Sequence, residues 1–403
     1  MRTRTPVLAA LLAAGAVIAP AIPAYAATPT DPAVSVAASA TTITISGHGW
    51  GHAHGMSQYG AQGAARDGLS YAQILAFYYP GTALGSFSGR VRVLITEDTD
   101  NNLTVRATRG LRLTDTGRAR TWTLPTSKHP KAWRLRTKNG NRQVLYKTGT
   151  WHRYHPGGHR TLKGDGQFSS TSGPMALRLP SGDAHYRGAL RLSNRDTVNV
   201  IGMEKYLRGV VPSEMPSSWK PAALQAQSVA ARTYAAFERA ANASRYFQVY
   251  DTTRSQVYKG SDAEVDTTDA AIAATAKRIV LYAGAPAFTQ FSSSSGGWTS
   301  AGSRPYLVAK QDIYDRPVVG NVGDPHFSWG PSTIPLAPLR SRFPGTLTSV
   351  QVTVRETPNT VGVGHVASVV LSGTGATPVT LSGEQFRSLY NLKSTYFSLS
   401  ATP

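Results

Sequence analysis

Apolar and polar positions follow two different periods along the chain, and each period dominates a different region. Between residues 86 and 190, short alternating runs such as Val91-Arg92-Val93 and Leu111-Arg112-Leu113 are separated by Gly, Asn and Asp. This pattern is typical of short strands joined by turns. From residue 191 onward, strand-like and helix-like patterns follow one another. The chain is therefore expected to have an α+β fold: a mixed sheet core with a few helices and a β-rich insertion or subdomain.

Helices are predicted where apolar residues recur at helical spacing or where helix-favouring residues accumulate. A long helix is expected from about 221 to about 242, because alanine is frequent there and proline is tolerated in the first turn. Shorter helices are expected at 57–63, 71–78, 203–210, 267–277 with Asp266 as N-cap, and 384–390 with Ser382 as N-cap. Strands are expected at 42–45, 197–200, 278–282, 349–354, 367–371 and 394–399.

The first 26 residues have the parts of a secretory signal peptide. Arg2 and Arg4 precede an apolar stretch from Val7 to Ile18, and Ala24-Tyr25-Ala26 supplies small residues for cleavage. We therefore expect residues 1–26 to be removed and the protein to be secreted. Residues 27–40 are small and polar with two prolines, so a flexible linker is expected. No later segment is apolar for long enough to cross a bilayer, so no stable membrane insertion is expected.

The charge predicts an anionic environment. The chain carries +20, and +18 without Arg2 and Arg4. Much of this charge lies in residues 106–163, interleaved with aromatic residues such as Trp122, Trp133 and Trp151. These rings could stack on sugars beside cations that bind phosphate or carboxylate, or simply fill a small β core. For a secreted protein, wall-attached phosphate polymers or anionic glycans are the expected partners and nucleic acid is not, although a solvated basic surface is the alternative. The chain has no cysteine, which excludes disulfides, thiol nucleophiles and thiolate metal sites.

Glu214 is the candidate catalytic residue. It stands in Val210-Val211-Pro212-Ser213-Glu214-Met215-Pro216, where prolines restrict the backbone and apolar neighbours disfavour the charged carboxylate. A carboxyl group that stays protonated near neutral pH can donate a proton to a glycosidic oxygen. The alternative is a glutamate that caps the following helix. On that helix Gln225, Ser228 and Arg232 share one polar face, which either faces water or lines a cleft beside Glu214.

Several segments, in order, resemble the stage II sporulation protein D family, also called the amidase-enhancer domain family. The matching residues are 206–216 with Trp219, 223–235 (ALQAQSVAARTYA), Asp251-Thr252-Thr253, 255–260 (SQVYKG), 291–297 (FSSSSGG) and the closing stretch from Phe386 to Phe397. The resemblance covers most of residues 186–403. It implies a cell-wall-associated protein with a catalytic core over 191–403. The change of pattern and the positive charge indicate a basic β-rich subdomain over 86–190.

The family's motif GHGxGMSQxGA normally follows the terminal strand, whereas its counterpart here, Gly51 to Ala61, comes first. Circular permutation is the simplest explanation, with residues 41–85 as the displaced piece of the core. It predicts that strand 42–45 lies beside or end to end with strand 394–399, and that the mature termini meet. Within the motif, Ala53-His54 replaces a glycine and a variable residue, so the local backbone is expected to differ.

The resemblance implies a lytic transglycosylase that cleaves the β-1,4 bond between N-acetylmuramic acid and N-acetylglucosamine in peptidoglycan glycan strands. Glu214 would be both acid and base, and an anhydro sugar would form without water. By the same resemblance, the candidate substrate-binding residues are Gln225, Arg232, Tyr234, Ser293 and Ser294, with His52, Ser57 and Gln58 on the opposite wall of the cleft. No cofactor is expected. No metal is expected either, because the family's cysteine-dependent zinc site is missing and glycines separate His48, His52 and His54.

Two other functions remain open. The first is a non-catalytic wall-binding protein that enhances a partner amidase, with residues 106–163 as the active surface and Glu214 as a cap. The second is a hydrolytic muramidase or glucosaminidase, whose products would carry a reducing end. Ordinary two-carboxylate glycosidases need a second acid within roughly 5 to 10 Å. Glu204 is near in sequence, and folding could bring Asp251 or Asp262 close.

Overall fold

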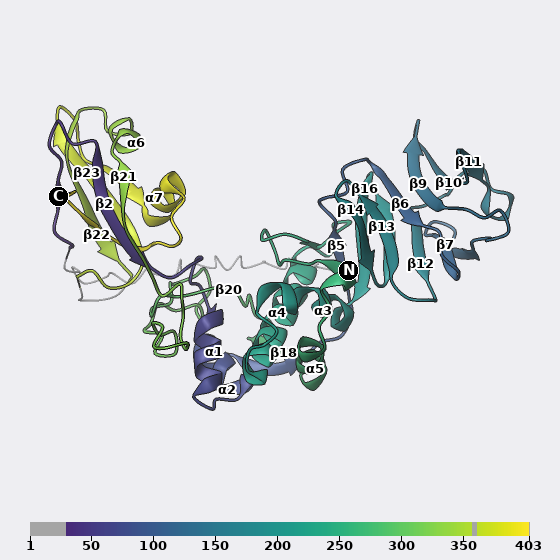
Figure 1. Ribbon diagram of the computed structural model, residues 1–403, viewed down its shortest axis with the longest axis horizontal. Coiled ribbons are helices and arrows are strands. Elements are labelled where there is room, and N and C mark those ends of the chain that lie inside the picture. The colour runs from purple at the N-terminus through teal and green to yellow at the C-terminus, as the bar shows by residue number, and fades with distance from the viewer. Residues whose placement is uncertain (1–29, 357–360, 403) are drawn as a thin grey trace, which may run out of the picture.

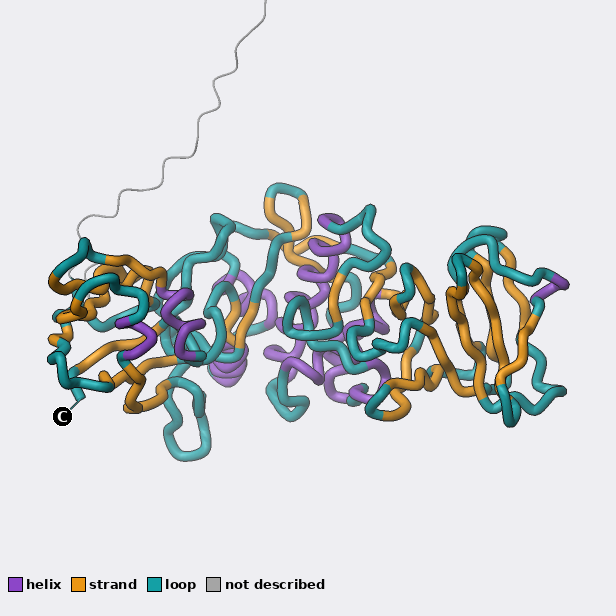
Figure 2. The backbone as a smooth tube through the Cα atoms, turned by 90° about the horizontal axis from the view of Figure 1, so that it is seen from above, coloured by secondary structure: helices purple, strands orange, loops and turns teal. Residues whose placement is uncertain are grey.

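The molecule is elongated and consists of three groups of elements, which we call the β lobe, the central lobe and the terminal lobe (Figure 1). The computed structural model describes residues 30–356 and 361–402, so the expected signal peptide lies outside the described residues. Viewed from above, strands dominate both ends and the long helices gather in the middle (Figure 2). The α+β fold class is thereby confirmed. Within the described residues, no helix combines the length and apolar character needed to cross a membrane.

The β lobe contains two facing sheets. The six-stranded sheet has the order β11 (Trp151–Tyr154), β10 (Asn141–Lys147), β9 (Ala132–Lys138), β6 (Asn102–Arg106), β13 (Met175–Leu179) and β14 (Gly182–Tyr186). The seven-stranded sheet has the order β17 (Val249–Tyr250), β5 (Arg90–Leu94), β16 (Asp196–Gly202), β15 (Ala189–Ser193), β12 (Gly166–Ser170), β7 (Leu111–Asp115) and β8 (Arg120–Thr123). All neighbouring pairs are antiparallel except β17 with β5. The boundary expected at residue 190 does not divide the sheets, because β16 and β17 lie beyond it.

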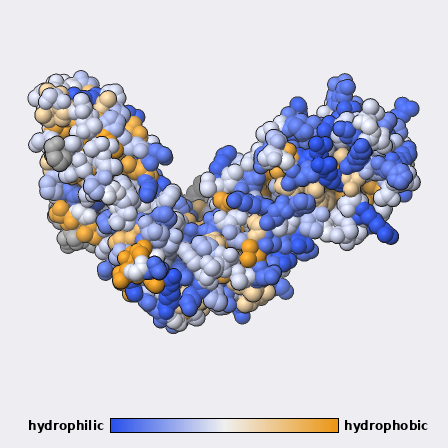
Figure 3. Space-filling model, in the orientation of Figure 1, coloured by the Kyte–Doolittle hydropathy of each residue, from blue (hydrophilic) through white to orange (hydrophobic). Residues whose placement is uncertain are grey.

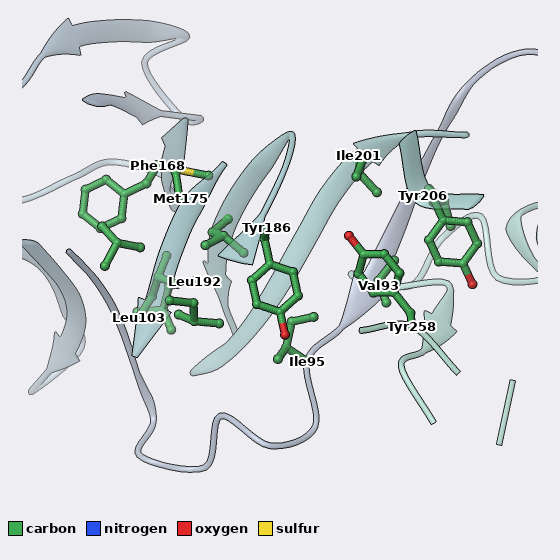
Figure 4. Packing of buried hydrophobic residues seen from close by; sticks show 14 of the residues in the cluster. Val93, Ile95, Leu103, Phe168, Met175, Tyr186, Leu192, Ile201, Tyr206 and Tyr258 are labelled. Carbon is green, nitrogen blue, oxygen red and sulfur yellow. The ribbon is translucent and has the colours of Figure 1, made fainter. Parts of the chain in front are cut away.

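One hydrophobic core joins the β lobe to the central lobe. Alternate side chains of both sheets point between them, as Figure 4 shows for Leu103, Phe168 and Met175. The same cluster continues through Ile201 to Tyr206, which belongs to the first helix after the sheet. Trp133 is buried in this core, whereas Trp151 is only partly covered. Trp133 therefore fills the β core, whereas Trp151 lies partly at the surface.

The central lobe consists mainly of helices. They are α1 (Gln58–Arg66), α2 (Tyr71–Tyr78), α3 (Met203–Glu214), α4 (Pro221–Ala241) and α5 (Asp266–Ala274), with short strands β3 (Met56–Ser57), β4 (Ala83–Ser86), β18 (Arg278–Tyr282), β19 (Ala285–Pro286) and β20 (Phe291–Ser292). The helix expected at 203–210 continues to Glu214, although Pro212 lies inside it. The expected N-cap Asp266 is already helical, and Val265 occupies the cap position without a side-chain hydrogen bond.

The terminal lobe combines both ends of the described chain around a core of its own. Its elements are β1 (Val34–Ser35), β2 (Thr42–His48), β21 (Ser328–Pro335), α6 (Ala337–Arg340), β22 (Thr346–Arg355), β23 (Val366–Thr374), β24 (Val379–Ser382), α7 (Gly383–Tyr390) and β25 (Tyr396–Ser400). β2 pairs with β25 in antiparallel fashion, Ile45 opposite Leu399, which confirms the expected neighbourhood of these strands. Circular permutation itself stays a prediction.

The expectation of a flexible linker at 27–40 is wrong for the part of this segment that the structure describes. β1 pairs with β22, and Val34 and Val36 are buried in the core of the terminal lobe. Asp31 is buried as well, and its carboxylate accepts hydrogen bonds from the guanidinium of Arg355. The composition suggested disorder because small polar residues dominate, but two valines and one ion pair suffice to hold this segment on the sheet.

Candidate functional site

A cleft of about 330 Å³ contains Glu214 and is lined by residues from five segments that are separated in the sequence. Glu214 is the last residue of α3 and is half-buried. The walls come from the N-terminal motif, α4, the loop after β17 and the loop of β20; the lining residues are Trp50, Gly51, His52, Glu214, Tyr234, Thr253, Arg254, Ser255, Gln290, Phe291, Ser292 and Ser293. Glu214 is the one carboxyl group among these described lining residues, so catalysis by a carboxyl group in the cleft would depend on it.

Burial raises the pKa of Glu214 above that of an ordinary glutamate. Two hydrogen bonds oppose this effect, one from the backbone N–H of Val257 to Oε1 at 2.8 Å and one with the side chain of Gln58. The position at the C-terminal end of α3 acts in the same direction as burial, because unpaired carbonyls there disfavour a negative charge. Glu214 does not cap α4, whose N-cap is Lys220. The carboxyl group is therefore held in place and biased toward its protonated form.

The polar face expected on α4 does not line this cleft. Arg232 is completely buried, and its guanidinium donates to both carboxylate oxygens of Glu204, at 2.9 and 2.7 Å. Ser228 is equally buried and donates to the backbone oxygen of Leu224. Gln225 lies outside the residues that line the cleft. Gln227, which was not among the expected site residues, lies instead behind the cleft, where Gln58 Nε2 donates to its Oε1 at 3.5 Å.

The other acids considered as partners for Glu214 are engaged elsewhere. Glu204 is paired with Arg232. Asp251 accepts from the backbone and the hydroxyl of Thr96, at 3.1 and 2.7 Å. Asp262 accepts from the backbone and ring nitrogens of His185, both at 2.8 Å. The described part of the cleft thus offers one carboxyl group instead of a pair.

The N-terminal motif reaches the cleft through a tightly folded backbone. Gly51 and Gly55 have positive φ angles of 113° and 70°, and a Cβ on Gly55 would lie 2.3 Å from the backbone oxygen of Gln290. Ala53 has φ 57°, so it adopts the left-handed conformation that favours glycine. The altered motif therefore keeps the glycine-like backbone at the cost of some strain.

His52 forms part of the cleft wall as a neutral ring. Its Nδ1 accepts from the backbone N–H of His54 at 2.9 Å, and the ring stacks on that of His54 with centroids 4.9 Å apart. Burial lowers the pKa of His52 to about 3, and His54 adds to the effect. His52 is therefore uncharged at neutral pH. Among the described residues, no group of three or more His, Asp or Glu side chains is arranged to hold a metal ion.

Tyr234 and Ser293 line the cleft, while Ser57 and Ser294 lie beneath it. The Tyr234 ring stacks on Phe288, and burial raises the pKa of its phenol to about 12, so it is a neutral hydrogen-bonding group. Ser57 donates to Asp315 Oδ2 at 2.9 Å, and Ser294 donates to the same oxygen at 3.2 Å. Ser57 and Ser294 thus hold two walls of the cleft together instead of facing it.

Three buried aspartates connect the two walls of the cleft to which Ser57 and Ser294 belong. Asp312, Asp315 and Asp324 are each at most 2% exposed and accept hydrogen bonds mainly from serine hydroxyls, backbone N–H groups and Tyr78. Burial and then the charge of Asp315 raise the pKa of Asp312 to about 7 and that of Asp324 to about 8. No local pattern predicts these aspartates as neighbours of the cleft, because they lie about a hundred residues from Glu214 along the chain.

Four aromatic rings continue from the cleft across the surface. Trp50 is 45% exposed, and its ring centroid lies 4.6 Å from that of His326. His326 in turn contacts Tyr59, and Tyr59 contacts Trp219 at 4.9 Å. Aromatic faces of this kind present apolar area suited to the apolar faces of sugar rings.

The geometry defines a protein with one carboxyl group of raised pKa in a cleft bordered by aromatic and hydroxyl side chains. Residues 192–282 match the family described as Stage II sporulation protein, which confirms the resemblance to the stage II sporulation protein D and amidase-enhancer family for this part of the chain. That segment includes α3 with Glu214 and α4, and hence one wall of the cleft.

Curated relatives agree with the family match. The chain is 40% identical over 120 residues to the Amidase enhancer of Bacillus subtilis, covering 28% of this chain and 16% of that protein. It is 34% identical over 149 residues to Stage II sporulation protein D of the same organism, covering 31% and 43% respectively. An uncharacterized protein of Brachyspira hyodysenteriae is 36% identical over 133 residues, covering 32% and 36%. The chain spans less than half the length of each of these relatives.

Proposed function

We propose that the protein is a secreted, cell-wall-associated lytic transglycosylase that cuts the glycan strands of peptidoglycan. The observation that carries the proposal is Glu214, a half-buried carboxyl group with a raised pKa and the one carboxyl group among the described lining residues. Cleavage by a single carboxyl group needs an acid that can later serve as a base, and this environment suits both forms. The match of residues 192–282 to the Stage II sporulation protein family supports a role at the cell wall.

In the proposed reaction, protonated Glu214 donates its proton to the glycosidic oxygen between N-acetylmuramic acid and N-acetylglucosamine. The bond from the muramic acid C1 to that oxygen breaks, and the oxygen leaves as the hydroxyl of the next sugar. The Glu214 carboxylate then accepts the proton of the muramic acid 6-hydroxyl, whose oxygen bonds to C1. The products are an anhydro sugar and a free chain end, Glu214 is protonated again, and no water is consumed.

The neighbours of Glu214 have separate proposed tasks. The N–H of Val257 and the amide of Gln58 orient the carboxyl group and stabilise its charged form in the second step. Tyr234 and Ser293 offer neutral hydrogen-bonding groups to the sugar hydroxyls and amides. Trp50, partly exposed at the rim, offers an apolar face for a sugar ring.

The test is the release of soluble fragments from purified peptidoglycan by the protein and by its Glu214→Gln variant. Glutamine keeps the shape and hydrogen bonding but has no ionisable proton, so release should fall at least about a hundredfold. Glu238→Gln is the matched control, because Glu238 is also partly buried with a raised pKa but lies outside the residues that line the cleft. Equal activity in the protein and in Glu214→Gln would contradict the proposal.

The second candidate is a non-catalytic protein that enhances a partner amidase. It is favoured by the 40% identity to a protein named Amidase enhancer. Under this function Glu214→Gln would leave wall binding and the stimulation of an added peptidoglycan amidase unchanged. Loss of fragment release together with unchanged wall binding would support the transglycosylase instead.

A further inference from the structure

The positive charge of the protein is concentrated in one part of the β lobe. Residues 106–163 contain fifteen Lys and Arg side chains and one acidic side chain, Asp115, so this segment contributes +14 of the total +20. Asp115 is buried and bound internally, with its carboxylate accepting from Arg118 and from the backbone of Lys163 and Gly164. The hydrophilic surface is densest over this lobe (Figure 3).

The strand register places many of these cations on the outer face of the six-stranded sheet. Along β9, Trp133 and Leu135 point into the core, so Arg134, Arg136 and Lys138 point outward. Residues directly opposite each other in neighbouring strands share a face. Five cross-strand pairs extend the outer set beyond β9: Arg134–Leu145, Ala132–Lys147, Leu145–Arg153, Arg106–Ala132 and Leu177–Val105. The outer set then contains seven cations: Arg106, Arg134, Arg136, Lys138, Lys147, Arg153 and Arg178.

Most of these cations have no acidic partner. Within the part of the chain that the structure describes, Arg106 is the one member of the set in an ion pair, with Asp183 at 2.6 Å. Arg134 Nε donates to the Thr104 hydroxyl and Arg136 Nε to the Gln143 amide, which fixes the two side chains without neutralising them. The six cations without an ion pair repel one another on one sheet face, so the protein is stabilised when anions bind there.

The cations on this face are regularly spaced. Outward residues on one strand recur at about 7 Å and neighbouring strands lie about 5 Å apart, so the cations form a two-dimensional grid. Several guanidinium groups can each bind a phosphate oxygen pair, which favours an extended ligand with repeating phosphates over a single small anion.

Two observations argue against other polyanions. The Trp151 ring is already covered by Arg134, 4.2 Å from its centroid, and lies near Lys147, so it offers little free face for stacking a nucleobase. None of the large apolar side chains exposed on the described surface lies between residues 90 and 190, so this face has no apolar anchor for a lipid bilayer.

We propose that the outer face of the six-stranded sheet, centred on Arg134, Arg136 and Lys138, binds a linear phosphodiester polymer of sugars or polyols attached to the bacterial wall. The wall as the source of the polymer rests on the proposed function, whereas the binding face does not depend on Glu214. This contact would hold the protein on the wall while the cleft, in another lobe, acts on the glycan.

The test measures binding of the full chain to purified polyribitol phosphate as a function of salt. We compare it with the triple variant Arg134→Gln, Arg136→Gln, Lys138→Gln and with a control triple variant of equal charge, Arg195→Gln, Lys205→Gln, Lys259→Gln, whose residues are exposed outside this face. The face variant should bind at least tenfold more weakly, and its plot of log affinity against log salt should be shallower by about two, the contribution of three phosphate contacts. The control should bind like the parent protein.

Three outcomes would overturn the inference: no binding to polyribitol phosphate, an equal loss in both triple variants, or tighter binding to single-stranded DNA or to anionic lipid vesicles of equal phosphate content. A separate readout keeps this test distinct from the proposed function. The face variant should still cut soluble, peptide-free glycan, and Glu214→Gln should still bind the polymer.

Discussion

The pKa of Glu214 is set by a balance between burial and two hydrogen bonds. Burial raises its pKa, whereas the Val257 N–H and the Gln58 amide lower it, and burial prevails. An acid of this kind remains protonated at a higher pH than an exposed glutamate, which suits proton donation. The same hydrogen bonds stabilise the carboxylate, which the proposed reaction requires when Glu214 acts as a base.

Gln58→Ala should shift the alkaline limb of the pH–activity profile to higher pH. Gln58 lowers the pKa of Glu214, so its removal raises that pKa and keeps the acid protonated over a wider range. The maximum rate should fall roughly tenfold, because the carboxylate needed in the second step loses a donor. Gln225→Ala is the matched control, since Gln225 is a partly buried glutamine outside the residues that line the cleft. A shift to lower pH in Gln58→Ala would contradict this account.

Ala53→Gly should stabilise the protein. Ala53 holds φ 57°, a conformation that costs an alanine about 1 kcal/mol more than a glycine. The free energy of unfolding from urea titration should therefore rise by up to about 1 kcal/mol. The reverse effect is expected for Ala240→Gly, where alanine lies in helix α4 and glycine is unfavourable. A loss of stability in Ala53→Gly would show that the backbone is not strained at this position.

The burial of Glu214 and the direction of its pKa shift could be predicted from the sequence, because two prolines and apolar neighbours lie within a few residues of it. Its catalytic role stays a prediction. The surroundings of Arg232 and Gln225 could not be predicted from neighbouring residues in the same way. Helical spacing predicts which residues share a face of α4, but not what packs against that face. Here Glu204 covers Arg232, and it is Gln227 that lies against Gln58 behind the cleft.

At the scale of elements, the cleft depends on a junction between α1 and the loop after β20. Ser57, which caps α1, and Ser295 both donate to Asp315 Oδ2, at 2.9 and 2.8 Å. Asp324 and Asp312 flank Asp315 in a buried group of carboxyl groups. Such a group is stable only while part of it is protonated, because adjacent buried carboxylates repel one another.

The junction should weaken as the pH rises. The pKa of Asp324 in the folded protein, about 8, lies above its ordinary value of 3.8, so the folded state binds more protons than the unfolded state. The associated stability is complete below about pH 4 and is lost as the pH rises through 8. Asp324→Asn, which mimics the protonated acid, should reduce this loss by at least about 1 kcal/mol between pH 5 and pH 9.

Thermal unfolding of the protein and of Asp324→Asn across this pH range provides the measurement. Asp67→Asn is the control, because Asp67 is in a largely exposed ion pair with Arg316 and should leave the pH dependence unchanged. An unchanged pH dependence in Asp324→Asn would mean that Asp324 is ionised throughout.

Several helices could be predicted from local patterns. The expected helices at 71–78 and 384–390 agree with α2 and α7 within one residue, because Ser70 and Ser382 each form a capping box. The end of α3 was predicted four residues early, since proline usually interrupts a helix. Pro212 is tolerated near the end of this helix, where few further backbone bonds are lost.

At the scale of the whole molecule, the cleft lies in the central lobe and the basic sheet face at the far end of the β lobe (Figure 1). The core of the β lobe runs without interruption into α3, so these two lobes form one packed unit. The terminal lobe has a separate hydrophobic cluster of its own. Binding and cleavage are therefore assigned to different lobes of one chain.

Asp31→Ala should destabilise the terminal lobe selectively. Asp31 is buried with Arg355, and its loss leaves a buried guanidinium without its carboxylate, which costs about 3 kcal/mol. In calorimetry the transition of the terminal lobe should move to lower temperature and separate from that of the remaining molecule. Asp67→Ala should cost less than about 1 kcal/mol, because its ion pair is largely exposed. A single, unshifted transition in Asp31→Ala would contradict the assignment.

The terminal lobe illustrates what the sequence alone could not provide. The pairing of β2 with β25 was expected on the hypothesis of circular permutation, which itself stays a prediction, because a displaced motif would have to stay near its original neighbours. The separate core was not expected. It forms between residues 34–45 and the described residues of 329–356 and 361–399, and contacts over such sequence distances leave no local pattern.

The most direct measurement of the central claim is mass spectrometry of products formed from peptide-free glycan strands in water labelled with heavy oxygen. The account predicts 1,6-anhydro-muramyl ends that lack the mass of one water and carry no label, and their absence with Glu214→Gln. Reducing ends that carry the heavy oxygen would contradict it, because they would show that water and not the 6-hydroxyl attacks the sugar.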